Sequence, residues 1–144
     1  MRMDESLVPL YQSWLESFAS REGGTAGTVH LRHGDALKLV AAINIPPPVL
    51  NAVRTIPHGK GMAGIAFATK EPVQTCNLQT DQSGHIEPGA RAVPVRASVA
   101  LPVFDEAGAV RAVVGIAFTY EGELSTEVTN MLSTAAHALP PDGF

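Results

Sequence analysis

An almost unbroken apolar segment in the last third of the chain constrains the fold more than any other feature of the sequence. Such a segment is typical of a β-strand covered on both faces, because no polar residues alternate with the apolar ones. The turn 105–108 precedes it, and a second apolar segment, 95–104, precedes the turn, so together they predict a β-hairpin over 95–120. Helices must cover at least one face of this hairpin, and a lid or a partner the other. The most apolar residues of the segment are Val113, Val114, Ile116, Ala117 and Phe118.

Amphipathic helices are predicted at both ends of the chain. Near the N-terminus, apolar residues recur at helical spacing on one broad face, and this helix is expected to end at Gly23-Gly24 after about five turns. Ser125 is expected to cap the closing helix, which Pro140-Pro141 ends. The apolar face of the first helix consists of Leu7, Leu10, Tyr11, Trp14, Leu15 and Phe18. The expected inner face of the closing helix consists of Val128, Met131, Leu132, Ala135 and Leu139.

Shorter elements are predicted in the middle of the chain. A turn at His33-Gly34-Asp35 separates two strands, and residues 78–93 form a long irregular segment of the kind that often carries function. With the hairpin and the terminal helices, these elements predict an antiparallel α+β fold with a sheet of about five strands. In chain order they are strands over 28–32 and 36–43, a short helix that ends near Arg54, a short helix over 61–69 and a strand over 73–77.

Composition excludes several classes of protein. With 144 residues, 45% of them hydrophobic and 17% charged, the chain has the size and apolar content of one globular domain. Its net charge of −4, without clustered Lys or Arg, argues against a nucleic-acid partner. No apolar run is long enough to span a membrane, and the first residues do not resemble a signal peptide. Cys76 is the only cysteine, which excludes an internal disulfide. We therefore expect a cytoplasmic protein that does not contact membranes.

Two segments of the chain resemble the GAF domain family. Residues 56–73, IPHGKGMAGIAFATKEPV, are similar to the family's proline–glycine segment, short helix and following strand, with Lys70 where glycine is usual. Residues 96–103, RASVALPV, are similar to a later strand of the family. The return strand of the hairpin and the closing helix follow at the family's spacing.

This resemblance implies one GAF-type domain over 1–144, with an N-terminal amphipathic helix over 1–22 and a GAF core over 25–139. It implies a central antiparallel sheet with the terminal helices on one face. A ligand pocket formed by loops and short helices is expected on the other face. It also implies a role in sensing or regulation, often as a homodimer through the terminal helices.

A glycine-rich motif and five histidines are candidates for binding sites. The segment Gly59-Lys60-Gly61-Met62-Ala63-Gly64 fits the dinucleotide-binding pattern G-x-G-x-x-G, and Asp81 follows it. No hydrophobic strand precedes the motif, however, so we interpret its glycines as permitting a tight turn and close packing of a helix on the sheet. None of the five histidines has a second ligand at a metal-binding spacing. The sequence therefore predicts no metal and no cofactor.

The candidate pocket lies on one face of the segment 95–104. Ser98 and Ala100 alternate with Val99 and Leu101, and the two small side chains leave space for a pocket floor. Two arginines at the start of this segment can hold a carboxylate or a phosphate if they point inward, and are ordinary surface charges if they point outward. The candidate ligand-binding residues are Phe67, Cys76, His85, Arg91, Arg96, Ser98 and Ala100.

The sequence leaves three functions open. The first is a non-catalytic sensory domain that binds an unknown small molecule and acts in signal transduction through a separate effector protein. The second is a dimerisation or adaptor module with a vestigial pocket. The third is thiol redox chemistry at Cys76, as in the free methionine sulfoxide reductases of the family. A single cysteine cannot form the intramolecular disulfide of such a cycle, and a small buried side chain is the simpler interpretation of Cys76.

Overall fold

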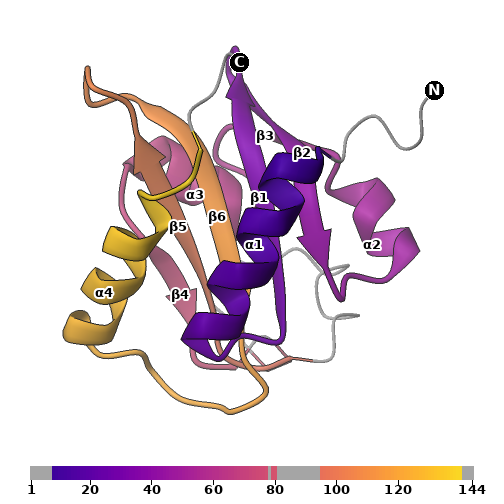
Figure 1. Cartoon of the computed structure of the whole chain (residues 1–144), viewed down its shortest axis with the longest axis vertical. Helices are drawn as coiled ribbons and strands as arrows, with labels where there is room; N and C mark the ends of the chain where they lie inside the picture. Colours follow the sequence, from indigo (N-terminus) through magenta and orange to yellow (C-terminus); the bar gives the residue numbers. More distant parts are fainter. Residues whose placement is uncertain (1–7, 78, 81–94, 141–144) are drawn as a thin grey trace.

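A six-stranded antiparallel sheet forms the centre of the molecule (Figure 1). The computed structural model describes residues 8–77, 79–80 and 95–140. The strands follow one another across the sheet in the order β3-β2-β1-β6-β5-β4. The elements are α1 (Pro9–Glu22), β1 (Ala26–His33), β2 (Ala36–Ile43), α2 (Pro47–Ala52), β3 (Thr55–Pro57), α3 (Gly61–Thr69), β4 (Val73–Thr75), β5 (Ser98–Phe104), β6 (Val110–Ala117) and α4 (Thr126–Ala136).

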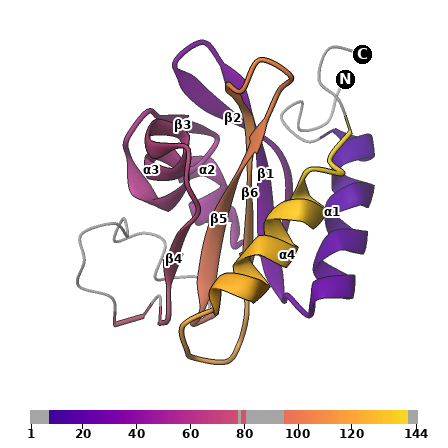
Figure 2. The same cartoon turned by 90° about the vertical axis from the view of Figure 1, so that its left-hand side faces the viewer.

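The helices divide between the two faces of the sheet (Figure 2). α1 and α4 lie side by side on one face, and α2 and α3 lie on the other. The main core fills the space between the sheet and the α1–α4 pair, where Tyr11, Leu15 and Phe18 of α1 are fully buried. The β6 segment is therefore covered on both faces, as its unbroken apolar sequence predicted. The strand residues of this core are Val29, Ala41, Val99, Leu101, Val103, Ala112, Val114 and Ile116.

α1 is fixed to the sheet by polar contacts as well as by its apolar face. It ends at Gly23, whose φ of 77° is the left-handed conformation that glycine adopts readily. A bulge in β2 turns the carbonyl of Val40 toward the helix, where it accepts a hydrogen bond from Val8 N at 2.7 Å. The Gln12 amide donates to Ala42 O at 2.8 Å and accepts from Ala42 N at 3.0 Å. These bonds extend the sheet's hydrogen bonding to its covering helix.

The predicted α+β fold and the positions of the terminal helices are confirmed, with two differences. The sheet has one more strand than expected: β3 is three residues long and contains Pro57, so it has no recognisable strand pattern. The buried face of α4 is also rotated from the expected one. Met131 is 60% exposed and Val128 is also exposed, whereas Thr129 is buried. Several apolar residues distributed around a short helix leave its rotation ambiguous, and packing against the sheet decides it.

Candidate functional site

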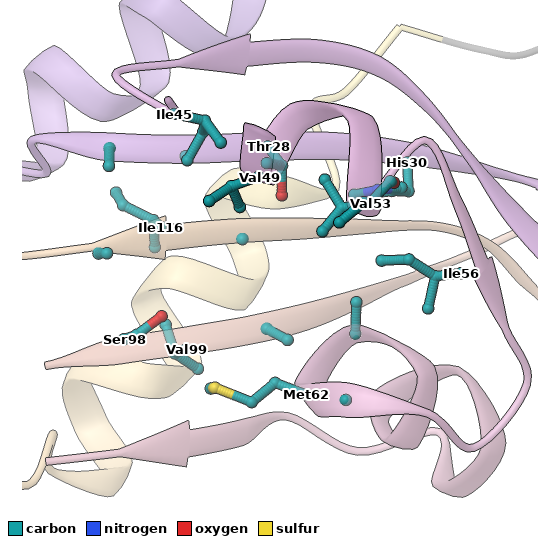
Figure 3. A pocket seen from close by; sticks show the side chains of 18 of the residues that line it. Thr28, His30, Ile45, Val49, Val53, Ile56, Met62, Ser98, Val99 and Ile116 are labelled. Carbon is teal, nitrogen blue, oxygen red and sulfur yellow. The ribbon is translucent and has the colours of Figure 1, made fainter. Parts of the chain in front are cut away.

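A pocket of about 520 Å³ lies on the sheet face that carries α2 and α3 (Figure 3). Its floor consists of β1, β6 and β5, and its walls come from the 45–53 segment and from β3 with the start of α3. Most of its lining side chains are small or aliphatic, which is typical of small-molecule sites. The lining residues are Ala26, Gly27, Thr28, His30, Ile45, Val49, Ala52, Val53, Thr55, Ile56, Pro57, Lys60, Gly61, Met62, Ala63, Val95, Ser98, Val99, Ala100, Gly115, Ile116 and Ala117.

The pairing register of three strands produces the floor. Thr28, Gly115 and Ala100 lie in one row across the sheet, because Gly115 pairs with both of the others. The next row is formed in the same way by Ala26 and Ser98 on either side of Ala117. A Cβ on Gly115 would lie 3.0 Å from the Thr28 hydroxyl oxygen. Because Gly115 has no side chain, the Thr28 hydroxyl fits beside it and the centre of the floor remains open.

The wall formed by the 45–53 segment, called the α2 wall because it contains α2, is attached to the sheet mainly at its ends. Before the helix, Asn44 adopts a positive φ of 55° and its side-chain amide donates to Thr25 O at 2.6 Å. After the helix, Leu39 N donates to Arg54 O at 2.9 Å. Val49 is the only buried residue of α2 itself. The wall is thus a short helical segment held by backbone-directed hydrogen bonds on both sides.

His30 occupies the end of the floor nearest to the α2 C-terminus. The residue is 2% exposed, and its Nε2 lies 2.8 Å from the carbonyl oxygen of Val53. A carbonyl only accepts, so Nε2 carries the proton and donates it. Burial lowers the pKa of His30 from 6.5 to about 4, although the bond to Val53 opposes the shift. The imidazole is therefore neutral at pH 7, with Nδ1 as an acceptor.

The glycine-rich motif has a structural explanation. Gly59 N donates to Gly64 O at 2.8 Å, and this turn connects β3 to α3. A Cβ on Gly64 would lie 2.6 Å from the carbonyl oxygen of Pro57, so only glycine permits this approach. The motif lets α3 lie close to β3, as interpreted from the sequence. Its Lys60 and Gly61 belong to the pocket lining, and Lys60 is exposed.

The structure brings together only part of the predicted site. Ser98 and Ala100 both line the pocket floor. Phe67 is not among the lining residues; its ring packs edge-on against His58 with centroids 5.0 Å apart. Arg96 and Cys76 are exposed and are also absent from the lining. The buried side chain expected for Cys76 is therefore wrong. His85 and Arg91 lie outside the described residues, as does most of the 78–93 segment.

The β1 half of the floor was not predicted from the sequence. Ala26, Thr28 and His30 alternate with buried Val29 and lie on the pocket side, yet His30 was considered only as a metal ligand. The available signal was a histidine between two apolar residues of a predicted strand, Val29 and Leu31. Such a residue needs a hydrogen-bond partner when it is buried.

The described part of the chain contains neither a cluster of metal ligands nor a helix that could span a membrane. No group of three or more His, Cys, Asp or Glu residues is placed to hold a metal ion. Within the same ranges, every helix is too short or too polar to cross a lipid bilayer.

Comparison with known proteins identifies the family and related folds. A family model described as "GAF domain" matches residues 10–139. No curated protein matches the chain. Many solved structures share the fold.

The type II free methionine-R-sulfoxide reductase of Thermoplasma acidophilum is 16% identical, with a TM-score of 0.70 over 89% of this chain and 85% of that one. The GAF domain of A. aeolicus nlh2, in an inactive state, is 18% identical, with a TM-score of 0.65 over 89% and 76%. The GAF domain of a phosphoenolpyruvate-protein phosphotransferase from Coxiella burnetii is 11% identical, with a TM-score of 0.73 over 90% and 77%. At these identities the likeness shows the fold, which a reductase and the GAF domains of two other proteins share.

Proposed function

Because the chain belongs to the GAF domain family, we propose that it is a sensory domain that binds a small molecule in the pocket and catalyses no reaction itself. The observation that carries this proposal is the pocket of about 520 Å³ with an aliphatic lining and a few hydroxyl and imidazole groups. A cavity of this size and composition suits a small organic ligand. Binding of the ligand would then change how the domain interacts with a separate effector protein.

The placement of Cys76 argues for binding rather than thiol chemistry. The cysteine is exposed and does not line the pocket, so a ligand held on the floor is away from the thiol. Among the described lining residues, His30 is the one ring base, and its Nε2 is engaged with Val53 O. His30 Nδ1 makes no hydrogen bond to a hydroxyl group of the described residues, so the described lining holds no hydrogen-bonded pair of nucleophile and base.

A thermal-shift screen with metabolites and cyclic nucleotides tests the proposal. A ligand present at one hundred times its Kd stabilises the folded form by about 2.7 kcal/mol, which raises Tm by several degrees. The pocket-blocking variant is Ser98→Leu, which adds a bulky side chain to the floor. The matched control is Ser17→Leu, at an exposed position of α1. The proposal predicts a shift in the parent and the control only. It is wrong if no compound shifts Tm, or if Ser98→Leu responds like the parent.

The exposed apolar residues of α1 and α4 favour a second function, pairing with another copy of the chain. Leu10 is 48% exposed and Met131 is 60% exposed, on two helices that cover the same face of the sheet. Exposed apolar side chains gathered on one face commonly mark an interface. Removal of α1 is not a suitable test, because its Tyr11, Leu15 and Phe18 belong to the core.

Point variants on the surface of α4 test this pairing. Light scattering is expected to give a dimer for the parent chain and a monomer for Met131→Lys. Asn130→Lys, also exposed on α4 but about 100° around the helix from Met131, is the matched control and is expected to remain dimeric. A monomeric parent, or a dimer that survives the Met131→Lys substitution, contradicts a role of this face in pairing.

A further inference from the structure

His30 has one ring nitrogen that nothing in the described part of the chain satisfies. Its Nε2–H donates to Val53 O, which leaves a lone pair on Nδ1. Nδ1 is buried and has no hydrogen-bond partner among the described residues. A buried acceptor without a donor destabilises the fold, so such a group in a native protein points to a missing partner. Because His30 lines the pocket, the pocket is where that partner would come from.

The remaining polar groups of the pocket indicate what kind of molecule fits around this acceptor. The hydroxyl groups of Thr28 and Ser98 lie on the floor and can donate or accept (Figure 3). Lys60 carries the one charge of the described lining, and it is exposed at the mouth. The walls beside them are aliphatic, with Ile45, Val49 and Met62 (Figure 3). The described interior thus offers hydroxyl groups and an acceptor, but no buried cation.

We propose that the pocket takes an uncharged, largely aliphatic molecule that carries an N–H or O–H group and donates it to His30 Nδ1. This inference rests on the proposed function, because it names the ligand class of the same pocket. It assigns His30 two tasks: Nε2 holds the end of α2, and Nδ1 selects the ligand.

The charge of the His30 ring argues against a carboxylate ligand, and the composition of the lining argues against a nucleobase. The neutral imidazole presents a lone pair, which repels a carboxylate and attracts a donor; the low pKa of His30 keeps the ring in this state at pH 7. Aromatic side chains are absent from the described lining, whereas sites that hold flat nucleobases usually stack them on aromatic rings. An uncharged aliphatic donor satisfies both the acceptor and the walls.

Access to Nδ1 couples binding to the α2 wall. Because Nδ1 is buried, a donor reaches it only when a neighbouring group moves aside. Val53 lies beside the ring in Figure 3 and belongs to the segment that Nε2 holds. Ligand binding is therefore expected to shift the backbone amide signals around Val53 together with the His30 ring signals.

Three probes of similar size distinguish the ligand classes. ε-Caprolactam carries an N–H donor, ε-caprolactone has an oxygen in its place, and cyclohexanecarboxylate is an anion. Each is titrated into the full chain and followed by ¹⁵N NMR of the backbone and of His30. One hydrogen bond corresponds to about a tenfold difference in Kd, so the lactam is expected to bind about tenfold more tightly than the lactone. The Nδ1 resonance is expected to move with the lactam alone.

Two substitutions separate the two nitrogens. His30→Gln can keep an N–H near the Nε2 position, for Val53 O, but lacks the acceptor at Nδ1. His30→Asn can place its carbonyl oxygen near the Nδ1 position but does not reach Val53. The lactam preference is expected to fall to about onefold in His30→Gln and to persist in His30→Asn. Backbone spectra of both variants report whether each remains folded.

Each outcome decides the inference. A lactam preference lost only in His30→Gln supports it. Equal binding of lactam and lactone by the parent chain overturns the inference and leaves the proposed binding function standing. Tighter binding of cyclohexanecarboxylate overturns the uncharged class and points to Lys60. If none of the three probes binds, the ligand class is wrong, while the metabolite screen decides separately whether the pocket binds anything. If both variants unfold, the parent's lactam-to-lactone ratio and its Nδ1 resonance decide.

Discussion

The Nε2 atom of His30 lies 2.8 Å from the carbonyl oxygen of Val53, and this contact joins the middle of the sheet to the end of α2. It fixes the tautomer of the buried His30 ring, so Nδ1 is a hydrogen-bond acceptor at that end of the pocket. Burial of the same ring also makes the stability of the fold depend on pH, because it lowers the pKa of His30.

Stability is expected to fall as His30 becomes protonated. Burial depresses its pKa from 6.5 to about 4, so the unfolded chain binds a proton more readily than the folded one between these values. The stabilisation of the fold that depends on a neutral His30 ring is complete above pH 6.5 and is lost as the pH falls toward 4. Between pH 7 and pH 5 the loss is about 2 kcal/mol. Urea unfolding of the parent chain and of His30→Gln measures it, because the other titrating groups are common to both. Equal pH slopes in the two proteins would contradict the depressed pKa.

Thr129→Val is expected to stabilise the protein. The Thr129 hydroxyl oxygen is buried on α4 and has no hydrogen-bond partner among the described residues. Valine has nearly the same shape and removes the unsatisfied group, so the free energy of unfolding should rise by about 1 kcal/mol. Thr134→Val, exposed on the same helix, should change it by less than about 0.5 kcal/mol. A loss of stability in Thr129→Val would mean that the hydroxyl has a partner.

Much of the fold could be predicted because its signals are local. Gly23 ends α1 and Ser125 caps α4, where its hydroxyl accepts from Val128 N at 3.1 Å. The apolar β6 segment required cover on both faces, and α1, α4, α2 and α3 provide it. By contrast, the rotation of α4 and the strand β3 depend on contacts between distant segments. Leu37 of β2 pairs with Ile56 of β3, a match that neither segment's own pattern reveals.

The pocket was predictable in part for the same reason. Ser98 and Ala100 alternate within one strand, so their common face is visible in the sequence. The row that joins Thr28, Gly115 and Ala100 depends on the registers of two strand pairs, which sequence periodicity does not determine. Cys76 was expected on a strand, but β4 ends at Thr75 and leaves the cysteine exposed.

Cys76→Ser is expected to change neither stability nor ligand binding. The thiol is exposed and outside the pocket lining, and the hydrogen bond from Gly122 N at 3.0 Å goes to the Cys76 backbone carbonyl, which serine retains. The free energy of unfolding should change by less than about 0.5 kcal/mol. Both proteins are also incubated with free methionine sulfoxide and dithiothreitol, and neither should produce methionine. Turnover by the parent chain that Cys76→Ser lacks would establish redox chemistry instead.

Gly64→Ala is expected to destabilise the protein, although alanine favours helices. Alanine in a helix interior is about 1 kcal/mol better than glycine, so propensity alone predicts a gain. At this position the new Cβ would lie 2.6 Å from Pro57 O, a backbone atom that moves only if α3 separates from β3. Overpacking of this kind costs about 2 kcal/mol, so the sign of the change distinguishes the two effects. Ala68→Gly, exposed on the same helix, measures the propensity term. A Gly64→Ala protein that is more stable than the parent would show that the close approach of α3 to β3 is not required. Because the start of α3 contributes to one wall of the pocket, the substitution should also weaken ligand binding.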